Sequence, residues 1–195
     1  MMKIRSPLMV DVISSLKAGD EVLLSGTVFT ARDVAHKRFV SLLEKGQSLP
    51  LELDGQIIYY TGPSPAKPGD LIGSAGPTTS YRMDQFSPVL LRQCGLKGMI
   101  GKGNRGHEVV EAIKESKAVY FAALGGAGAL IAQRIISSEV VCYDDLGPEA
   151  VRKLVVEDLP LVVAIDSHGN NLYLQGPSRY QGPSRYQGPP QYRRT

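Results

Sequence analysis

The sequence predicts an α/β protein with a mixed sheet, and three observations lead to that class. Short β-branched or fully apolar runs, such as 21–29 and 118–124, are typical of strands. Other segments, such as 107–117, carry apolar residues at helical spacing. The first half of the chain is richer in strands, whereas strands and helices alternate in the second half, which favours a mixed sheet.

The first half is expected to contain a short amphipathic segment, a strand, a helix, two further strands and a broken helix, at 11–16, 21–29, 30–46, 56–60, 71–73 and 82–94. Thr30–Asp33 has the pattern of a capping box with Asp in place of Glu, so the first long helix should begin there. Gly46 follows the last apolar residues of that helix and is suited to its C′ position. Pro88 is expected to break the helix at 82–94.

The second half is expected to contain strands at 99–100, 118–124 and 140–143, with helices at 107–117 and from 125–129 toward Ile136. Pro148 suits the N1 position of a third helix, whose inner face would carry Val151, Leu154 and Val155. The segment 161–174 is interpreted as a hairpin, with strands at 161–165 and 171–174 and a turn at 166–170.

The end of the chain differs in composition from everything before it. Gln175–Tyr180 recurs at once as Gln181–Tyr186, and a degraded third copy follows. Because Gly, Pro, Ser and Gln cannot build a core, we interpret 175–195 as a disordered tail. Residues 1–174 are then expected to form one domain, a length that allows a full core.

Charge and hydropathy narrow the function classes. The net charge is only +3 and the body has no Lys/Arg-rich run, so nucleic-acid binding is not expected. No apolar run has the length of a membrane span, and Met1–Pro7 lacks the apolar core of a signal peptide. The sequence is therefore expected to belong to a cytoplasmic protein without a membrane or nucleic-acid partner. Cys94 and Cys142 are too few for a structural zinc site or an iron–sulfur cluster, so no metal site is expected on this chain.

Two segments concentrate chemistry suited to a small anion. Gly76–Asp84 places Thr78, Thr79 and Arg82 close together, and Ile100–Asn104 places Lys102 between two glycines. Hydroxyl, guanidinium and ammonium groups bind carboxylate or phosphate through charge-assisted hydrogen bonds. A threonine hydroxyl needs an activating neighbour to act as a base, and Lys102 is the best candidate. Equally, one threonine could be the N-cap of the helix that contains Arg82.

An internal repeat adds a second cation. Lys17–Asp20 matches Lys67–Asp70 fifty residues later, and at the same offset Arg32 matches Arg82. Each copy is predicted to be a turn, a strand, a glycine-containing loop and an arginine at a helix start. Because a cation opposes the helix dipole there, Arg32 is expected to have an anionic partner. The two arginines could hold the two ends of a dicarboxylate, although a purely structural repeat explains the pattern as well.

Other motifs give weaker evidence for a function. Gly101–Gly106 fits G-x-G-x-x-G, but no acid lies between Glu115 and Glu139 to bind a ribose, which argues against a dinucleotide site. The histidines are scattered without metal partners at helical spacing. His36 is expected on the solvent side of its helix.

The motifs resemble those of the iron–sulfur-dependent class I fumarate hydratases and L-tartrate dehydratases, in the β subunit or the equivalent C-terminal domain of single-chain enzymes. The segments that carry this resemblance are 30–33, 35–38, 75–84, 100–103, 146–150, 156–158 and 164–167. It extends nearly to Tyr173, and the repeated tail is not part of it. The resemblance implies a three-layer swivelling β/β/α domain.

The resemblance also implies an activity and a partner. The enzyme would add water to a four-carbon dicarboxylate, converting fumarate to malate, with Thr78 as the base. Arg32, Arg82 and Lys102 would bind the carboxylates beside Thr79, with Lys102 also close to the chemistry. A [4Fe–4S] cluster would be held by three cysteines of a separate α subunit, in an α2β2 assembly. The alternatives are the β subunit of a tartrate dehydratase and a non-catalytic anion-binding domain.

Overall fold

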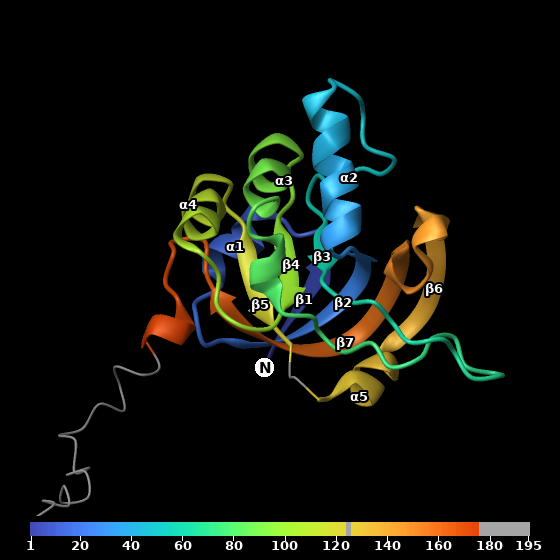
Figure 1. The fold of residues 1–195 in the computed structure, drawn as a ribbon. Coiled ribbons are helices and arrows are strands. Elements are labelled where there is room, and N and C mark those ends of the chain that lie inside the picture. Colours follow the sequence, from blue (N-terminus) through green and yellow to red (C-terminus); the bar gives the residue numbers. More distant parts are fainter. Residues whose placement is uncertain (124–125, 176–195) are drawn as a thin grey trace, which may run out of the picture.

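The computed structural model describes residues 1–123 and 126–175, and these form a mixed sheet with helices (Figure 1). Its strands are β1 (Met2–Ser6), β2 (Glu21–Thr30), β3 (Ile57–Tyr59), β4 (Gly98–Gly101), β5 (Val119–Ala122), β6 (Ile135–Cys142) and β7 (Val151–Ile165). Its α-helices are α1 (Val10–Ser15), α2 (Asp33–Glu44), α3 (Ser87–Gln93), α4 (His107–Glu115) and α5 (Gly128–Ala132). Two 3₁₀ helices, η1 (Ser80–Met83) and η2 (Asp144–Glu149), complete the described elements. The predicted α/β class with a mixed sheet is confirmed.

The sheet closes on itself. Strands β1 to β5 pair in parallel in chain order, and β7 lies antiparallel to β5, β6 and β2. Because β7 reaches both β5 and β2, the ring β2–β3–β4–β5–β7 is closed, with β1 and β6 as additional strands outside it. A closed ring leaves few unpaired backbone groups at its edges.

Alternation along the strands divides the core into two layers. Phe121 of β5 lies in one apolar cluster together with side chains of β2 and β7, whereas its neighbour Tyr120 lies in the other. The second cluster includes Phe39 of α2, Leu90 of α3 and Ile113 of α4. Figure 1 shows these three helices together on one side of the sheet, with α5 apart from them. One face of the ring therefore fills its own interior and the other face packs against helices.

Most predicted elements of the first half are confirmed. Helix α2 ends in a Schellman motif, in which Gly46 has φ +68° and Gln47 N–H donates to Leu42 O at 2.9 Å. The capping box was wrong, because Arg32 is the N-cap residue of α2. Thr30 instead accepts the Arg152 N–H at 2.9 Å, which ties β2 to β7. The expected strand at 71–73 is a loop.

The largest correction concerns residues 148–165. The helix expected from Pro148 is absent, and β7 begins at Val151 and continues to Ile165. Partners in β2 and β6 are available on both edges of this segment, so tertiary pairing prevails over its apparent helical spacing. The expected hairpin is confirmed in its first strand, which lies in β7, and in its turn, but not in its second strand, because only Asn171 bridges Ile165 and residues 172–175 are helical. The predicted tail at 176–195 lies outside the described residues.

Candidate functional site

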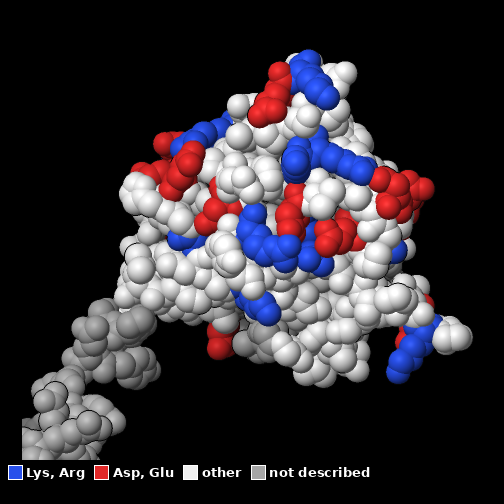
Figure 2. Space-filling view, viewed as in Figure 1, with Lys and Arg blue, Asp and Glu red and all other residues white. Residues whose placement is uncertain are grey.

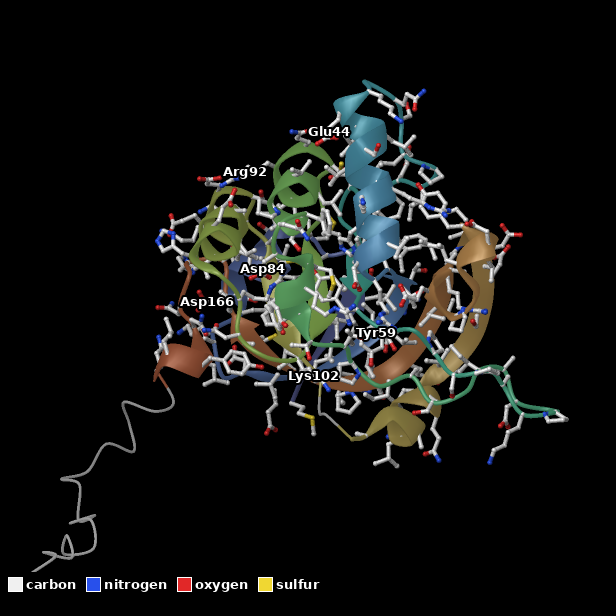
Figure 3. The ribbon with its side chains drawn as sticks, viewed as in Figure 1. Glu44, Tyr59, Asp84, Arg92, Lys102 and Asp166 are labelled. Atoms are coloured by element: carbon white, nitrogen blue, oxygen red, sulfur yellow. The ribbon has the colours of Figure 1, made fainter. Side chains whose placement is uncertain are left out.

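The predicted site residues gather where parallel strands end. Arg32 follows the carboxyl end of β2, and Lys102 follows that of β4. Between them, the loop after β3 leads to Thr78 and then to Arg82 in η1. Loops at the carboxyl ends of parallel strands are the usual place for a ligand site in an open α/β sheet, and this closed sheet presents the same edge. In Figure 3, Lys102 lies at the edge of the fold away from the free ends of α2 and α3.

Backbone pairing joins the two motifs that the sequence singled out. Thr79 and Lys102 form an isolated parallel bridge. Ser80 N–H donates to Lys102 O at 2.9 Å, and Lys102 N–H donates to Thr78 O at 3.3 Å. Thr78 N–H in turn donates to Tyr60 O, just beyond β3, at 2.6 Å. The threonine and lysine segments are therefore fixed side by side by main-chain hydrogen bonds.

The polar groups of these segments remain available to a ligand. Thr79 occupies the N-cap position of η1, but its side chain makes no capping hydrogen bond. Thr78 precedes that position, so the local structure does not use it as a cap. Within residues 1–123 and 126–175, neither the Thr78 hydroxyl nor the Lys102 ammonium has a hydrogen-bond or ion-pair partner. Lys102 is exposed and Thr78 is half-buried.

The two glycines around Lys102 serve the fold, each in a different way. A Cβ at Gly101 would lie 2.0 Å from Ser80 Oγ, so only glycine allows η1 to pack there. Gly103 has φ +83°, a conformation that side chains other than glycine rarely adopt. These glycines therefore bring the threonine segment and the lysine loop together.

The two arginines of the internal repeat meet at one carboxylate. Asp33, the first residue of α2, pairs with Arg82, and its Oδ1 lies 3.9 Å from Arg32 Nε. Arg32 Nη1 pairs with Glu149 Oε1 at 3.1 Å. The expected anionic partner of Arg32 therefore exists, and it belongs to the same chain. Arg32 Nε itself is buried without a hydrogen-bond acceptor among the described residues, so one strong donor remains unused.

The repeat is partly structural. Gly19 and Gly69 both have left-handed φ, and in both turns the Asp N–H donates to the Lys carbonyl at 2.9 Å. The copies then diverge, since a long strand follows the first turn and an extended loop follows the second. The shared turns confirm the repeat, and the convergence of Arg32 and Arg82 shows that both copies end at the same place.

Arg82 and its partner Asp33 border a shallow groove of about 400 Å³. Its lining includes Asp33, Lys37, Arg82 and Phe86. Figure 2 shows basic side chains gathered in the middle of this face, next to acidic ones, below the α2 and α3 regions of Figure 1. Basic and acidic side chains therefore lie side by side on this face, as in the pairs of Arg32 with Glu149 and Arg82 with Asp33.

His36 does not lie on the solvent side of its helix, contrary to the prediction. It is fully buried, its ring centroid lies 5.4 Å from that of Tyr60, and it also contacts Phe39 and Phe86. Burial lowers the pKa of His36 to about 4, so the ring is neutral at neutral pH. Its Nδ1–H donates to Arg32 O, 2.9 Å away, and this bond supports the residue before α2 from inside the core.

The sequence interpretation missed residues that fasten the lysine loop. Tyr173 OH accepts the Gly103 N–H at 3.1 Å, and Asn171 Nδ2 donates to Asn104 Oδ1 at 2.9 Å. The buried guanidinium of Arg105 pairs with Asp84 Oδ1 at 2.6 Å. These partners are 21 to 70 residues apart in sequence, so no local pattern could indicate them.

The cysteines do not fit an iron–sulfur cluster. Cys94 and Cys142 are free and partly buried, as predicted. Burial raises the pKa of both thiols, that of Cys142 to about 11, which disfavours the thiolate that a cluster requires. The part of the chain that the structure describes contains no group of three His, Cys, Asp or Glu side chains arranged to hold a metal. It also contains no helix long and apolar enough to cross a membrane.

Comparison with known proteins identifies the family. The model of the fumarase C-terminus family matches residues 1–176. The chain belongs to this family. The L(+)-tartrate dehydratase β subunit of Escherichia coli is 36% identical over 171 residues, which cover 86% of this chain and 84% of that subunit. A Methanocaldococcus jannaschii protein provisionally given the same name is 39% identical, over 85% of its length.

The family also includes much longer relatives. The aerobic class I fumarate hydratase of Escherichia coli is 37% identical over 164 residues, which cover 84% of this chain but only 30% of that enzyme. Fumarate hydratase 2 of Leishmania major is 36% identical over 28% of its length. The chain therefore corresponds to nearly all of a β subunit and to less than a third of these hydratases. Both named activities are hydro-lyase activities, so the chain is a member of a hydro-lyase family.

Proposed function

We propose that this chain is the β subunit of a hydro-lyase that adds water reversibly to fumarate. The observation that carries the proposal is the corner where main-chain hydrogen bonds and the Thr79–Lys102 bridge join the threonine segment to Lys102, next to the arginine pair that begins with Arg82. Membership of the family supports the reaction type. The exposed cations of this corner support a substrate with two carboxylates.

Each side chain then has a role. Thr78 exchanges the proton at the substrate carbon, and Lys102, whose backbone is bonded to that of Thr78, stabilises the alkoxide form of the hydroxyl. Arg32 and Arg82 bind one carboxylate through charge-assisted hydrogen bonds, and the unused Nε of Arg32 supplies a donor. Lys102 and Thr79 contact the other end of the substrate.

The cluster belongs to a partner in this proposal. Two poorly ionised cysteines cannot hold a [4Fe–4S] group, so a cysteine-bearing α subunit must provide its ligands. The bound cluster would supply a Lewis acid for the leaving hydroxyl. Two relatives are named as β subunits, which supports the existence of such a partner. We propose an α2β2 assembly in the cytoplasm. The closed sheet with helices on one face is compatible with a swivelling, three-layer β/β/α domain, which would let this site move toward the cluster.

A second candidate is the β subunit of an L-tartrate dehydratase. It is favoured by the matches that cover most of a named tartrate dehydratase subunit. A non-catalytic anion-binding domain is the third possibility, because the same cations would serve it.

The test is reconstitution with the cysteine-bearing α subunit, iron and sulfide. The loaded complex should hydrate fumarate and dehydrate malate, and the isolated chain should be inactive. Activity on tartrate but not fumarate would replace the first candidate by the second. A complex with a full cluster that turns over neither substrate would leave only the anion-binding domain. Turnover by this chain alone would contradict the dependence on a partner.

A further inference from the structure

A buried ion pair lies directly behind the two motifs of the site. The side chain of Arg105 is 0% exposed, and its Nε donates to Asp84 Oδ1 at 2.6 Å. The other oxygen of Asp84 accepts the Gly106 N–H at 2.6 Å. Arg105 Nη2 also donates to Ser87 Oγ at 2.8 Å. One carboxylate therefore holds both the side chain and the following backbone of the lysine loop, and Figure 3 shows Asp84 between the helices and Lys102.

Two tyrosines extend this contact to the threonine segment. The guanidinium of Arg105 lies 5.3 Å from the ring centroid of Tyr60 and 5.1 Å from that of Tyr120. Tyr60 O accepts the Thr78 N–H. Tyr120 OH donates to Gly103 O at 2.9 Å and lies 2.8 Å from Ser80 Oγ. Arg105 thus packs between the rings of two tyrosines, of which Tyr60 is bonded to the threonine segment through its main chain and Tyr120 to both segments through its hydroxyl.

Stability alone does not account for this pair. Removing a guanidinium and a carboxylate from water is costly, and well-packed apolar side chains of similar volume often replace a buried ion pair without loss of stability. A buried pair does fix direction, because its hydrogen bonds form only in one arrangement of the two segments. Asp84 lies two residues after Arg82, and Arg105 lies three residues after Lys102.

We propose that Asp84 and Arg105 are positioning residues, which set the separation of the substrate-binding cations Arg82 and Lys102. This inference rests on the proposed function, since it assigns both cations to one dicarboxylate. Neither Asp84 nor Arg105 touches the substrate. Their effect reaches it through the short segments 82–84 and 102–105, which they clamp together.

The same two helices offer a matched control. Asp84 precedes α3 and Arg105 precedes α4, so their pair joins the helix beginnings. Arg92, in the last turn of α3, pairs with Glu115 at 2.6 Å and with Glu108 at 3.5 Å, both of α4. This second contact joins the same helices at a surface away from Lys102, and its side chains are well exposed.

The experiment replaces the pair by apolar residues in the complex reconstituted with its α subunit. The variant Asp84→Leu/Arg105→Met should keep a melting temperature close to that of the parent. Its KM for fumarate and its dissociation constant for succinate, a four-carbon dicarboxylate that cannot lose water, should rise about 10- to 100-fold, because misplacement of binding groups carries a cost of this order. Its kcat should also fall, because Lys102 is proposed to stabilise the alkoxide of Thr78 as well, and Arg92→Ala should leave all three constants unchanged.

The outcomes separate this inference from the function on which it rests. If Arg82→Ala and Lys102→Ala weaken succinate binding but the double variant does not, the positioning role is overturned and the proposed function stands. If Arg82→Ala and Lys102→Ala also bind succinate normally, the proposed function fails and the inference fails with it. Should the double variant not fold, Asp84→Asn takes its place, since it keeps the shape and removes the charge. Parent-like succinate binding by Asp84→Asn would then overturn the inference.

Discussion

The two halves of the candidate site are held in different ways. Thr78 and Lys102 are fixed through their backbones, and their side-chain polar groups have no partner among the described residues. Arg32 and Arg82, in contrast, are held through their side chains by Asp33 and Glu149. The first half is ready to receive a ligand without rearrangement, whereas a substrate carboxylate must share or displace carboxylates of the protein in the second half.

This difference separates chemistry from binding. Preorganised groups that need no reorganisation at the moment of reaction suit a proton transfer. Side chains already engaged in ion pairs suit reversible capture of a charged substrate, because the exchange of one carboxylate for another costs little. Changes in the first half should therefore affect turnover most, and changes in the second half should affect both binding and stability.

The largest expected effect is that of Thr78→Ala. Loss of a general base typically lowers the rate by about 100- to 10,000-fold, and kcat and kcat/KM should fall together because the contact acts mainly in the transition state. Steady-state kinetics on the reconstituted complex, with cluster content checked, measure this. Thr79→Ala is the matched control and should have a smaller effect, mainly on KM. A Thr78→Ala enzyme with near-normal kcat would show that the proton acceptor lies on the other subunit.

The next largest effects are expected from replacing the cations. Arg32→Ala, Arg82→Ala and Lys102→Ala should each weaken succinate binding by about 2–5 kcal/mol, since a substrate carboxylate loses its charged partner. Arginine-to-lysine variants should recover only part of this affinity, because lysine keeps the positive charge but lacks the bidentate geometry of arginine.

Stability tells the two halves apart. Arg32→Ala leaves Glu149 without its partner and should also lower the free energy of unfolding by about 1 kcal/mol. Lys102→Ala breaks no ion pair within residues 1–123 and 126–175, so it should not lower the free energy of unfolding. Calorimetry measures succinate binding, and thermal unfolding measures stability. Arg38→Ala is the control, because Arg38 lies on α2 like Asp33 and pairs with Asp145. Equal stability losses for Lys102→Ala and Arg32→Ala would remove the contrast between the halves.

Acid should affect the arginine half through His36. Burial lowers the pKa of His36 from 6.5 to about 4, so below pH 6.5 the unfolded chain binds a proton that the native chain does not. The free energy of unfolding is therefore unaffected by His36 above pH 6.5, and it decreases as the pH falls toward 4, by roughly 3 kcal/mol in all. Urea unfolding at pH 7 and pH 4.5, for the parent and His36→Gln, measures this loss. The variant should lose less stability between these pH values than the parent, and an identical loss in both would contradict the assignment to His36.

The backbone-held half should depend on Gly101. A Cβ there would lie 2.0 Å from Ser80 Oγ and 2.9 Å from Tyr60 Cδ2, so Gly101→Ala should lower the free energy of unfolding by about 1–3 kcal/mol. In a Ser80→Ala background the cost should shrink, because the closest atom is gone, but the contact with Tyr60 remains. Thermal unfolding of the four proteins gives the coupling between the two positions. Additive effects would mean that Ser80 does not hold the two segments together.

The residue types of the candidate site and much of the framework can be predicted from local patterns in the sequence. The hydroxyls, the two repeated arginines and the lone lysine between glycines were recognisable without a structure. Strands β2 to β5 and helices α2 and α4 were predicted close to their observed bounds. Their signals are local: apolar periodicity, Gly46 at a helix end and short β-branched runs depend on neighbours a few residues away.

Other features depend on contacts between segments that are far apart in the sequence. Residues 151–155 have spacing that suits a helix, but they form the start of β7 because β2 and β6 offer partners on both edges. His36 is buried because Tyr60 and Phe86, far away in sequence, cover it. Gly101 is required because Ser80 of another segment packs against it, and Arg105 is buried because Asp84 of another segment pairs with it. Each of these outcomes depends on contacts between distant residues, and such contacts have no period along the chain that a sequence could display.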